Sequence, residues 1–181
     1  MAATAQQPPI LILHELDLRS RQHASALPQQ IEMKNTWDGI GFKLADISLV
    51  VPLEQVSEIL TGVTISRIPG AKEWVHGVAN VRGNLLPILD LNGFLSGKVN
   101  KINRKSRILV MQHKGVTAGL VVHEVAGMRH FFEEELSDDV KQMNKVVQPL
   151  LSGIFHRGRD LWGIFDIRKL VEMPEFMQVA A

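Results

Sequence analysis

From residue 37 onward, hydrophobic and polar residues alternate in short runs, a pattern that predicts β-strands with one buried face. Ile40, Phe42 and Leu44 alternate first, and after a turn at 45–46 the alternation resumes over 47–53. The pattern predicts ten short strands and only a few short helices, so the fold class is mainly β. The expected strands cover 37–44, 47–53, 63–68, 78–82, 85–91, 107–113, 116–122, 125–131, 152–156 and 161–167.

Two of these strand pairs repeat the same pattern. The segments 77–91 (GVANVRGNLLPILDL) and 153–167 (GIFHRGRDLWGIFDI) align without a gap, 76 residues apart, and each places two apolar runs around a charged glycine turn, as in a β-hairpin. Val56 lies 21 residues before the first segment and Val125 lies 28 before the second, so the second half carries about seven extra residues. A duplicated β unit predicts two joined barrels with a partner-binding groove between them. The matched positions are Gly77, Leu85, Ile88 and Asp90 with Gly153, Leu161, Ile164 and Asp166.

The ends of the chain differ from this middle part. Residues 1–36 are expected to be a tail followed by a helix over 10–27, bounded by prolines, and a linker. The duplicated domain is expected over 37–171, with a first barrel core at about 37–97 and a second at about 107–171, although strands are free to exchange between them. Residues 168–171 are expected to form one helical turn under the second barrel, and 172–181 a tail.

Composition restricts the function classes. The net charge of +1 gives no support for nucleic-acid or membrane-surface binding. Cysteine is absent, which excludes disulfides, thiolate metal sites and cysteine nucleophiles. No signal peptide is recognisable and no run reaches the roughly 20 apolar residues that span a bilayer, so a cytoplasmic protein without direct membrane insertion is expected.

Motifs for chemistry are largely missing. There is no nucleotide-binding glycine pattern, no serine-nucleophile motif and no zinc-type histidine spacing. His113 and His123 are able to meet across adjacent strands, but strand-end histidines usually take only a hydrogen bond. Asp90 and Asp166 end apolar strands, so they are expected to cap the following turns rather than to act as paired catalytic carboxylates. We expect no catalytic residues, no metal, no cofactor and no enzyme.

Two charged residues stand among apolar neighbours in the first repeat. Arg82 occupies a turn (ANVRGN) and Glu58 an apolar stretch (QVSEIL). An arginine held by a carboxylate is oriented before a partner arrives, which lowers the entropy lost on binding. The other interpretation is a solvated turn arginine of little energetic weight, and the residues alone do not separate the two. The basic turn 156–159 and the acidic run 133–135 are interpreted as solvated surface.

The same residues resemble a known family. The runs VPLEQVSEIL and RIPGAKEWVHGVANVRGNLLPILDLNGFL are similar to the signature of the CheW-like coupling domain, over residues 37–171 and most specifically in the first half. Leu60 and His123 depart from the common pattern, where other members often have arginine and aspartate. The signature residues present are Val56, Glu58, Ile59, Arg67, Pro69, Val75, Gly77, Asn80, Arg82, Gly83, Pro87, Asp90 and Leu91.

This resemblance implies two five-stranded SH3-like barrels that act as a non-enzymatic adaptor. Such adaptors bridge the cytoplasmic signalling tip of a chemoreceptor and the regulatory domain of a CheA-type histidine kinase, and are recruited to membrane-bound receptor arrays. By position, the resemblance assigns Val56, Glu58, Arg82 and Gly83 to receptor binding. It assigns Leu91, Phe94 and Leu95 to kinase binding, with Phe94 either exposed or packed under its own barrel.

The N-terminal extension and the sequence around WVHGVANVRG resemble the branch of the family that controls type IV pili and twitching motility. A general flagellar chemotaxis coupling protein is the alternative within the family. Outside it, a small β-barrel enzyme or ligand-binding protein predicts a deep pocket with convergent ionisable groups. A nucleic-acid-binding barrel using 98–107 and 157–159 is disfavoured by the absence of tyrosine and the near-neutral charge.

Overall fold

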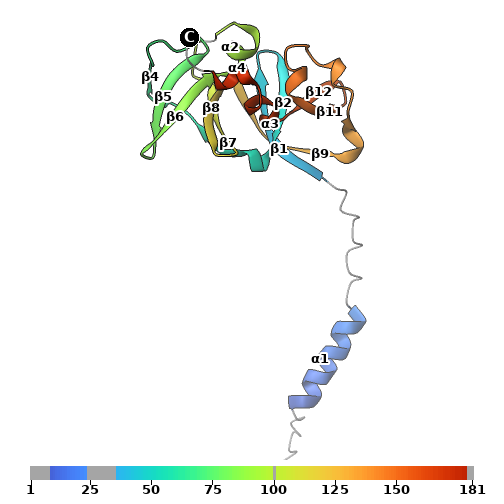
Figure 1. Cartoon of the computed structure of the whole chain (residues 1–181). Coiled ribbons are helices and arrows are strands. Elements are labelled where there is room, and N and C mark those ends of the chain that lie inside the picture. Colours follow the sequence, from blue (N-terminus) through green and yellow to red (C-terminus); the bar gives the residue numbers. More distant parts are fainter. Residues whose placement is uncertain (1–8, 24–35, 100, 179–181) are drawn as a thin grey trace, which may run out of the picture. The chain divides into compact units, whose positions relative to one another are not determined.

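The structure, a computed structural model, describes residues 9–23, 36–99 and 101–178 (Figure 1). Helix α1 (Pro9–His23) belongs to a unit of its own, residues 1–33, and exposes Ile10, Leu13 and Leu16. It begins one residue before the expected helix, whose last residues, 24–27, lie outside the described residues, as do 1–8 and the expected linker at 28–35.

Residues 34–181 form a second unit, which is mainly β as the sequence predicts. Its described part holds two six-stranded sheets with the orders β3-β7-β8-β6-β5-β4 and β10-β11-β12-β2-β1-β9. The strands are β1 (Thr36–Leu44), β2 (Ile47–Pro52), β3 (Val56–Leu60), β4 (Ile65–Ser66), β5 (Val75–Val81), β6 (Asn84–Asp90), β7 (Arg107–His113), β8 (Val116–Val122), β9 (Glu124–Phe132), β10 (Leu136–Ser137), β11 (Leu151–Arg157) and β12 (Asp160–Phe165).

Each sheet takes strands from both halves of the chain. Hairpin β7–β8 joins β3–β6, and hairpin β1–β2 joins β9–β12, so the two halves exchange their first hairpins. We call the two assemblies the β3–β8 barrel and the β9–β12 barrel, the latter including β1 and β2. Because a chain half cannot close its own barrel, the exchange interlocks the two barrels.

The duplication extends to the register of every repeated pair. In hairpin β5–β6, Gly77 pairs with Ile88 and a bulge separates it from Val75; in hairpin β11–β12 the pairs and the bulge recur 76 residues later. The pairing of β3 with β7 recurs in that of β9 with β1, again with its bulge. Identical registers show that the repeat seen in the sequence is a repeat of the backbone.

The repeat also places the seven extra residues. Measured between equivalent pairing positions, the stretch from Arg129 on β9 to Leu136 on β10 is two residues longer than the stretch from Leu60 on β3 to Ile65 on β4. The connection between β10 and β11 is five residues longer than that between β4 and β5, and forms two 3-10 turns, Val140–Gln142 and Gln148–Leu150. Those turns bury Met143, Val147 and Leu150 in the core, whereas the shorter connection 67–74 stays exposed or half-buried.

The buried apolar residues form three cores. A large core joins the two barrels and includes Phe42, Leu89 and Phe165. A smaller core fills the β3–β8 barrel around Ile88, and a third, rich in aromatic rings, fills the β9–β12 barrel. In that third core the rings of Phe131 and Phe155 are stacked, with their centroids 4.3 Å apart.

Short helices cover the ends of the repeated hairpins. Helix α2 (Leu91–Ser96) follows β6 and α3 (Ile167–Val171) follows β12. The Asp90 carboxylate accepts a hydrogen bond from the Gly93 N–H (3.0 Å), and the Asp166 carboxylate accepts one from the Arg168 N–H (3.0 Å). The predicted capping role of both aspartates is therefore confirmed.

The structure departs from the expected elements in two respects. Each sheet has six strands rather than five, because β3 and β10 were missed: β3 mixes charged and apolar residues around a bulge, and β10 has only two residues. The expected C-terminal tail is packed at its start, where helix α4 (Pro174–Met177) buries Phe176 against Trp74 and Phe94. An aromatic residue in a polar segment gave little sign of that burial.

Candidate functional site

The turn between β5 and β6 presents the first candidate residues in a strained conformation. Arg82 and Gly83 both have positive φ (51° and 88°), as a two-residue hairpin turn requires. The Asn80 side-chain oxygen accepts a hydrogen bond from the Gly83 N–H (2.8 Å) and fixes the turn. Glycine adopts this conformation freely, but a left-handed arginine costs about 1–2 kcal/mol. Strain of this kind clusters at functional positions.

Arg82 is joined to Glu58 by an ion pair. The Arg82 Nη2 donates to Glu58 Oε1 at 2.6 Å, so the structure brings the two sequence-predicted residues together. Strand β3 lies at one edge of its sheet and the β5–β6 hairpin near the other, so the pair bridges strands that share no ladder. The Arg82 side chain is 79% exposed and that of Glu58 27% exposed, which leaves the guanidinium available to a partner. Such an exposed pair contributes at most about 1 kcal/mol to folding.

Apolar residues flank this ion pair. Val56 is half-buried and packs against the core that joins the barrels. Leu85, three residues after Arg82, is 73% exposed, and Ile59 on β3 is also exposed. The sequence analysis did not single out Leu85, because the repeat pattern gives Leu85 and Leu161 equivalent positions; in the structure Leu161 is half-buried against the joining core, whereas Leu85 is not.

The repeat offers a second exposed apolar strand. Strand β9 corresponds to β3, and its Met128, which corresponds to Ile59, is 52% exposed. Glycine replaces glutamate at the position of Glu58 (Gly127), and no counterpart of the Glu58–Arg82 pair exists among the described residues of the β9–β12 barrel. The oriented charge is therefore confined to the first hairpin.

The second group of candidates, on α2, is less accessible. Leu91 has no exposed surface, so it cannot touch a partner directly and serves the core. Phe94 packs under its own barrel, with its ring 5.1 Å from that of Trp74 and 5.3 Å from that of Phe176. Phe94 and Leu95 are half-buried, so only their outer edges are open to contact. Of the two expectations for Phe94, an exposed side chain or one packed under its own barrel, the structure contradicts the first.

Ionisable groups elsewhere serve local structure. The Arg168 guanidinium donates to both oxygens of Asp166 (2.9 Å and 2.7 Å), and this hydrogen bonding holds the pKa of Asp166 below its usual range despite burial. His123 Nδ1 accepts a hydrogen bond from the Ala45 N–H (3.2 Å). In the described part of the chain, no three His, Asp or Glu side chains are grouped as a metal ion requires.

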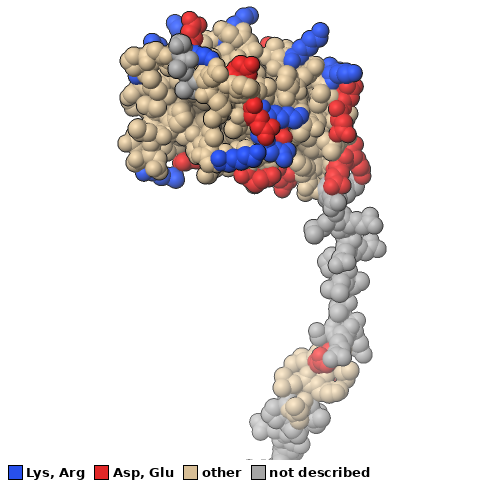
Figure 2. Space-filling view, in the orientation of Figure 1, with Lys and Arg blue, Asp and Glu red and all other residues tan. Residues whose placement is uncertain are grey.

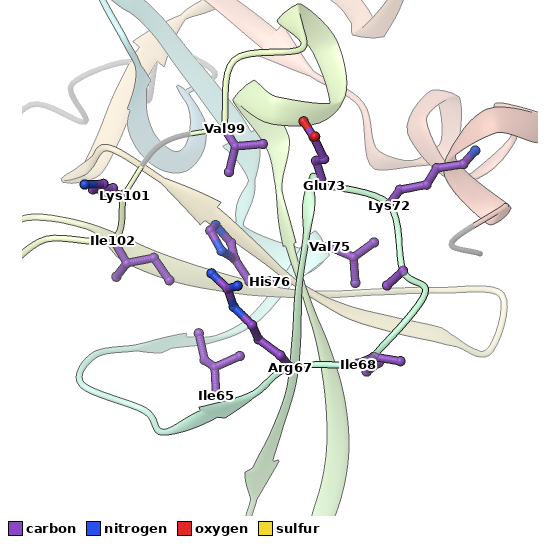
Figure 3. Close-up of a pocket in the computed structure, with 11 residues that line it drawn as sticks. Ile65, Arg67, Ile68, Lys72, Glu73, Val75, His76, Val99, Lys101 and Ile102 are labelled. Carbon is purple, nitrogen blue, oxygen red and sulfur yellow. The ribbon is translucent and has the colours of Figure 1, made fainter. Parts of the chain in front are cut away.

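An open groove lies beside β4 and β5, with a volume of about 840 Å³ (Figure 3). It is lined by three cations, one carboxylate, a histidine and aliphatic side chains, without a nucleophile. An open groove of this composition suits an acidic partner surface better than a small substrate. Its residues are Ile65, Arg67, Ile68, Ala71, Lys72, Glu73, Val75, His76, Val99, Lys101 and Ile102.

Comparison with known proteins places this geometry in a family. The family model described as the CheW-like domain matches residues 38–175, which span both barrels. The chain belongs to the CheW-like family. It is a CheW-like coupling or scaffold protein, as the sequence resemblance predicted.

Several CheW-like relatives cover most of the chain. Protein PilI of Pseudomonas aeruginosa is 40% identical over 96% of this chain and 97% of its own length. The chemotaxis protein CheW of Helicobacter pylori is 28% identical over 82% of this chain and 84% of its own length. The crystal structure of the scaffolding protein TtCheW from Thermoanaerobacter tengcongensis superimposes with a TM-score of 0.69, at 23% identity, over 78% of this chain and 96% of that one. This last likeness concerns the fold, two SH3-like barrels. Among the described residues, no helix is long and apolar enough to cross a membrane.

Proposed function

We propose that this protein couples the cytoplasmic signalling tip of a methyl-accepting chemoreceptor to the regulatory domain of a CheA-type histidine kinase, in a system that controls type IV pili and twitching motility. The observation that carries the proposal is the Glu58–Arg82 ion pair, set on a strained turn beside exposed leucine. The chain's similarity to PilI, over nearly its whole length, supports the type IV pilus system rather than another one.

In this proposal the receptor docks at the β5–β6 turn. Glu58 holds the guanidinium of Arg82 in place before docking, so little side-chain entropy is lost when the receptor binds. Gly83 allows the turn to approach the partner closely, while Val56 and Leu85 supply apolar contacts. A helical receptor tip with apolar side chains and a hydrogen-bond acceptor matches this surface.

The kinase is proposed to bind a different part of the β3–β8 barrel. The outer edges of Phe94 and Leu95 on α2 are the contacts proposed, supported from below by Leu91 and by the rings of Trp74 and Phe176. Because α2 follows the end of β6 opposite to its turn, both partners are able to bind at once. Simultaneous binding is what an adaptor requires.

Arg82→Ala tests the receptor surface. Loss of an oriented, partly desolvated charge should cost about 1–3 kcal/mol of receptor binding, a 5- to 150-fold weaker affinity. Affinity for the kinase regulatory domain should not change. Isothermal titration of the full chain against a receptor signalling-tip fragment and against the kinase domain measures both.

The matched control is Arg159→Ala, because Arg159 is an exposed arginine at the corresponding turn of the second hairpin. It should leave both affinities unchanged. Equal receptor affinity in Arg82→Ala and the unmodified protein would reduce Arg82 to an ordinary turn residue and remove the proposed receptor surface.

A flagellar chemotaxis role is the alternative, in keeping with the similarity to the chemotaxis protein CheW. Deleting the gene in the native organism separates the two roles. Lost twitching with normal swimming supports the proposal, and lost swimming with normal twitching supports the alternative.

A further inference from the structure

Among the described strands, the chain crosses between the two barrels twice. It leaves the β9–β12 barrel after β2, passes through the 3-10 turn Leu53–Gln55 and enters the β3–β8 barrel at β3. It returns at His123, between β8 and β9. The first crossing ends directly before Val56 and three residues before Glu58, two of the residues proposed to bind the receptor. The contacts that hold this crossing therefore affect the position of the receptor-binding edge.

Helix α3 lies where the two barrels meet. It follows β12 of the β9–β12 barrel, but its Ile167 is buried in the joining core, to which Met111 of the β3–β8 barrel also belongs. Figure 2 shows charged side chains of both signs gathered over the part of this face where Figure 1 labels α3. At the end of α3, Glu172 Oε1 lies 3.5 Å from Lys114 Nζ, which is on the β7–β8 turn. The helix is thus fastened to the barrel to which its preceding strand does not belong.

The beginning of α3 is tied to the first crossing by a hydrogen bond. The first N–H groups of a helix have no partner within the helix, and a buried one needs an acceptor from elsewhere. The Asp166 carboxylate accepts from the Arg168 N–H. The Ile167 N–H donates instead to Gln55 Oε1, at 3.3 Å. Ile167 is buried and Gln55 half-buried, so the side chain of Gln55 supplies an acceptor where the access of water is restricted.

The second crossing is held differently. His123 Nδ1 accepts a hydrogen bond from the Ala45 N–H (3.2 Å), and the His123 N–H donates to the Lys43 carbonyl (3.0 Å). Both partners belong to the β1–β2 hairpin, so these bonds tie the crossing to the barrel that it enters. Glu124, which corresponds to Gln55 in the repeat, is exposed. The bond from the first crossing to a helix of the other barrel is therefore not repeated by these contacts.

We propose that Gln55 is a positioning residue for the receptor-binding edge, an inference that rests on the proposed function. By holding the crossing against α3, Gln55 fixes the start of β3 and keeps Val56 against the joining core. Ser57 Oγ donates to the Val110 carbonyl (3.0 Å) and fixes the adjoining bulge. A docking edge that is held before its partner arrives loses less entropy on binding. Gln55 acts through Val56 and Glu58 rather than by touching the receptor.

The test measures hydrogen exchange and binding in variants of the full chain. Gln55→Met keeps the length of the side chain but removes the acceptor, so the Ile167 N–H should exchange with solvent at least about ten-fold faster. Affinity for a receptor signalling-tip fragment should fall about 3- to 10-fold, because the edge is no longer held, while affinity for the kinase regulatory domain stays unchanged. NMR-detected amide exchange and isothermal titration provide these values.

Gln55→Glu is the conservative variant. Its carboxylate keeps an acceptor at the start of a helix, where negative charge is favourable, so it should restore exchange and receptor affinity to within about two-fold of the unmodified chain. His123→Ala is the matched control, because it removes a side-chain acceptor at the other crossing. It should leave receptor affinity unchanged. Urea denaturation of all three variants measures any loss of stability, which by itself does not separate receptor affinity from kinase affinity.

Several results would overturn the proposal and leave the proposed function intact. Unchanged receptor affinity in Gln55→Met, or unchanged exchange of the Ile167 N–H, would show that the bond does not hold the receptor edge. Equal losses of affinity in Gln55→Met and Gln55→Glu would mean that the acceptor is not what matters. Equal losses toward receptor and kinase would make Gln55 a general structural residue. An unmodified chain that does not bind the receptor fragment would instead refute the proposed function, and this inference with it.

Discussion

The β3–β8 and β9–β12 barrels share one backbone design but differ in what they present at the surface. Their hairpins pair in the same register, their bulges coincide and both end in an aspartate-capped helix. The first barrel has Arg82 on a strained turn and an open basic groove, whereas the second has Gly158 at the position of Arg82 and a longer connection that packs into the core joining the barrels. The two repeats thus share the residues that build the barrel and differ at surface positions of the turn and of the connection.

The largest effect is expected when a charged side chain is introduced into the core of either barrel. Ile88 and Ile164 occupy the same position in the repeat and are both buried, so Ile88→Asp or Ile164→Asp should cost about 3–5 kcal/mol of unfolding free energy. Because the barrels exchange hairpins, each variant should unfold the whole of 34–181 in one transition. Thermal unfolding followed by circular dichroism measures this. A variant in which one barrel melts while the other persists would contradict the interlocked arrangement.

A glycine distinguishes the two barrels more finely. A Cβ on Gly77, whose φ is +137°, would overlap the carbonyl oxygen of Ser66, whereas a Cβ on the corresponding Gly153 would lie 3.3 Å from the carbonyl oxygen of Ser137. Gly77→Ala should therefore destabilise the protein by about 2–3 kcal/mol, and Gly153→Ala by about 1 kcal/mol or less. Urea denaturation of both variants provides the comparison. Equal losses would mean that β4 approaches β5 no more closely than β10 approaches β11.

Leu85 and Leu161 occupy the same position in the repeat but should have different roles. Leu161 is half-buried, so Leu161→Ser should cost about 1–2 kcal/mol of stability, whereas the exposed Leu85 should tolerate serine within about 0.5 kcal/mol. Under the proposed function, Leu85→Ser should weaken receptor binding and Leu161→Ser should not. Denaturation and receptor-tip titrations of both variants separate stability from binding. A large stability loss in Leu85→Ser would assign it to the core.

The smallest expected difference concerns acid stability. Hydrogen bonding from Arg168 lowers the pKa of Asp166 from its ordinary 3.8, so the ionised carboxylate stabilises the fold above that value and this contribution is lost as pH falls through the lowered pKa. Arg168→Met should therefore lower the melting temperature at neutral pH, and its difference from the unmodified chain should shrink below about pH 4. In an Asp166→Asn background, where the cap is retained without a titrating group, Arg168→Met should have no such pH dependence. A pH-independent difference in both backgrounds would show that Arg168 acts only through packing.

The sequence was sufficient for the repeated hairpins, because Gly77, Ile88 and Asp90 recur at fixed spacing and a period of two is a strong local signal. It was insufficient for β3, whose bulge breaks the alternation. It also missed the burial of Phe176, which depends on rings more than 80 residues away in the chain.

The candidate site was predictable to a similar degree. Glu58 and Arg82 stood out as charges among apolar residues, and the structure joins them at 2.6 Å. The burial of Leu91 and Phe94 was not readable from the sequence, since an apolar residue after a strand suits a surface patch and a core equally well. The exposure of Leu85 was also not readable from the sequence, because its repeat partner Leu161 has the same pattern and packs against the joining core.

The central claim is that one chain holds receptor and kinase together, and its most direct test is the sedimentation of all three components. The full chain, a receptor signalling-tip fragment and the kinase regulatory domain are mixed at concentrations that saturate each binary complex. The account predicts a species containing all three, and Arg82→Ala should remove only the receptor fragment from it. Mutually exclusive binding, in which the kinase domain displaces the receptor fragment, would contradict the account.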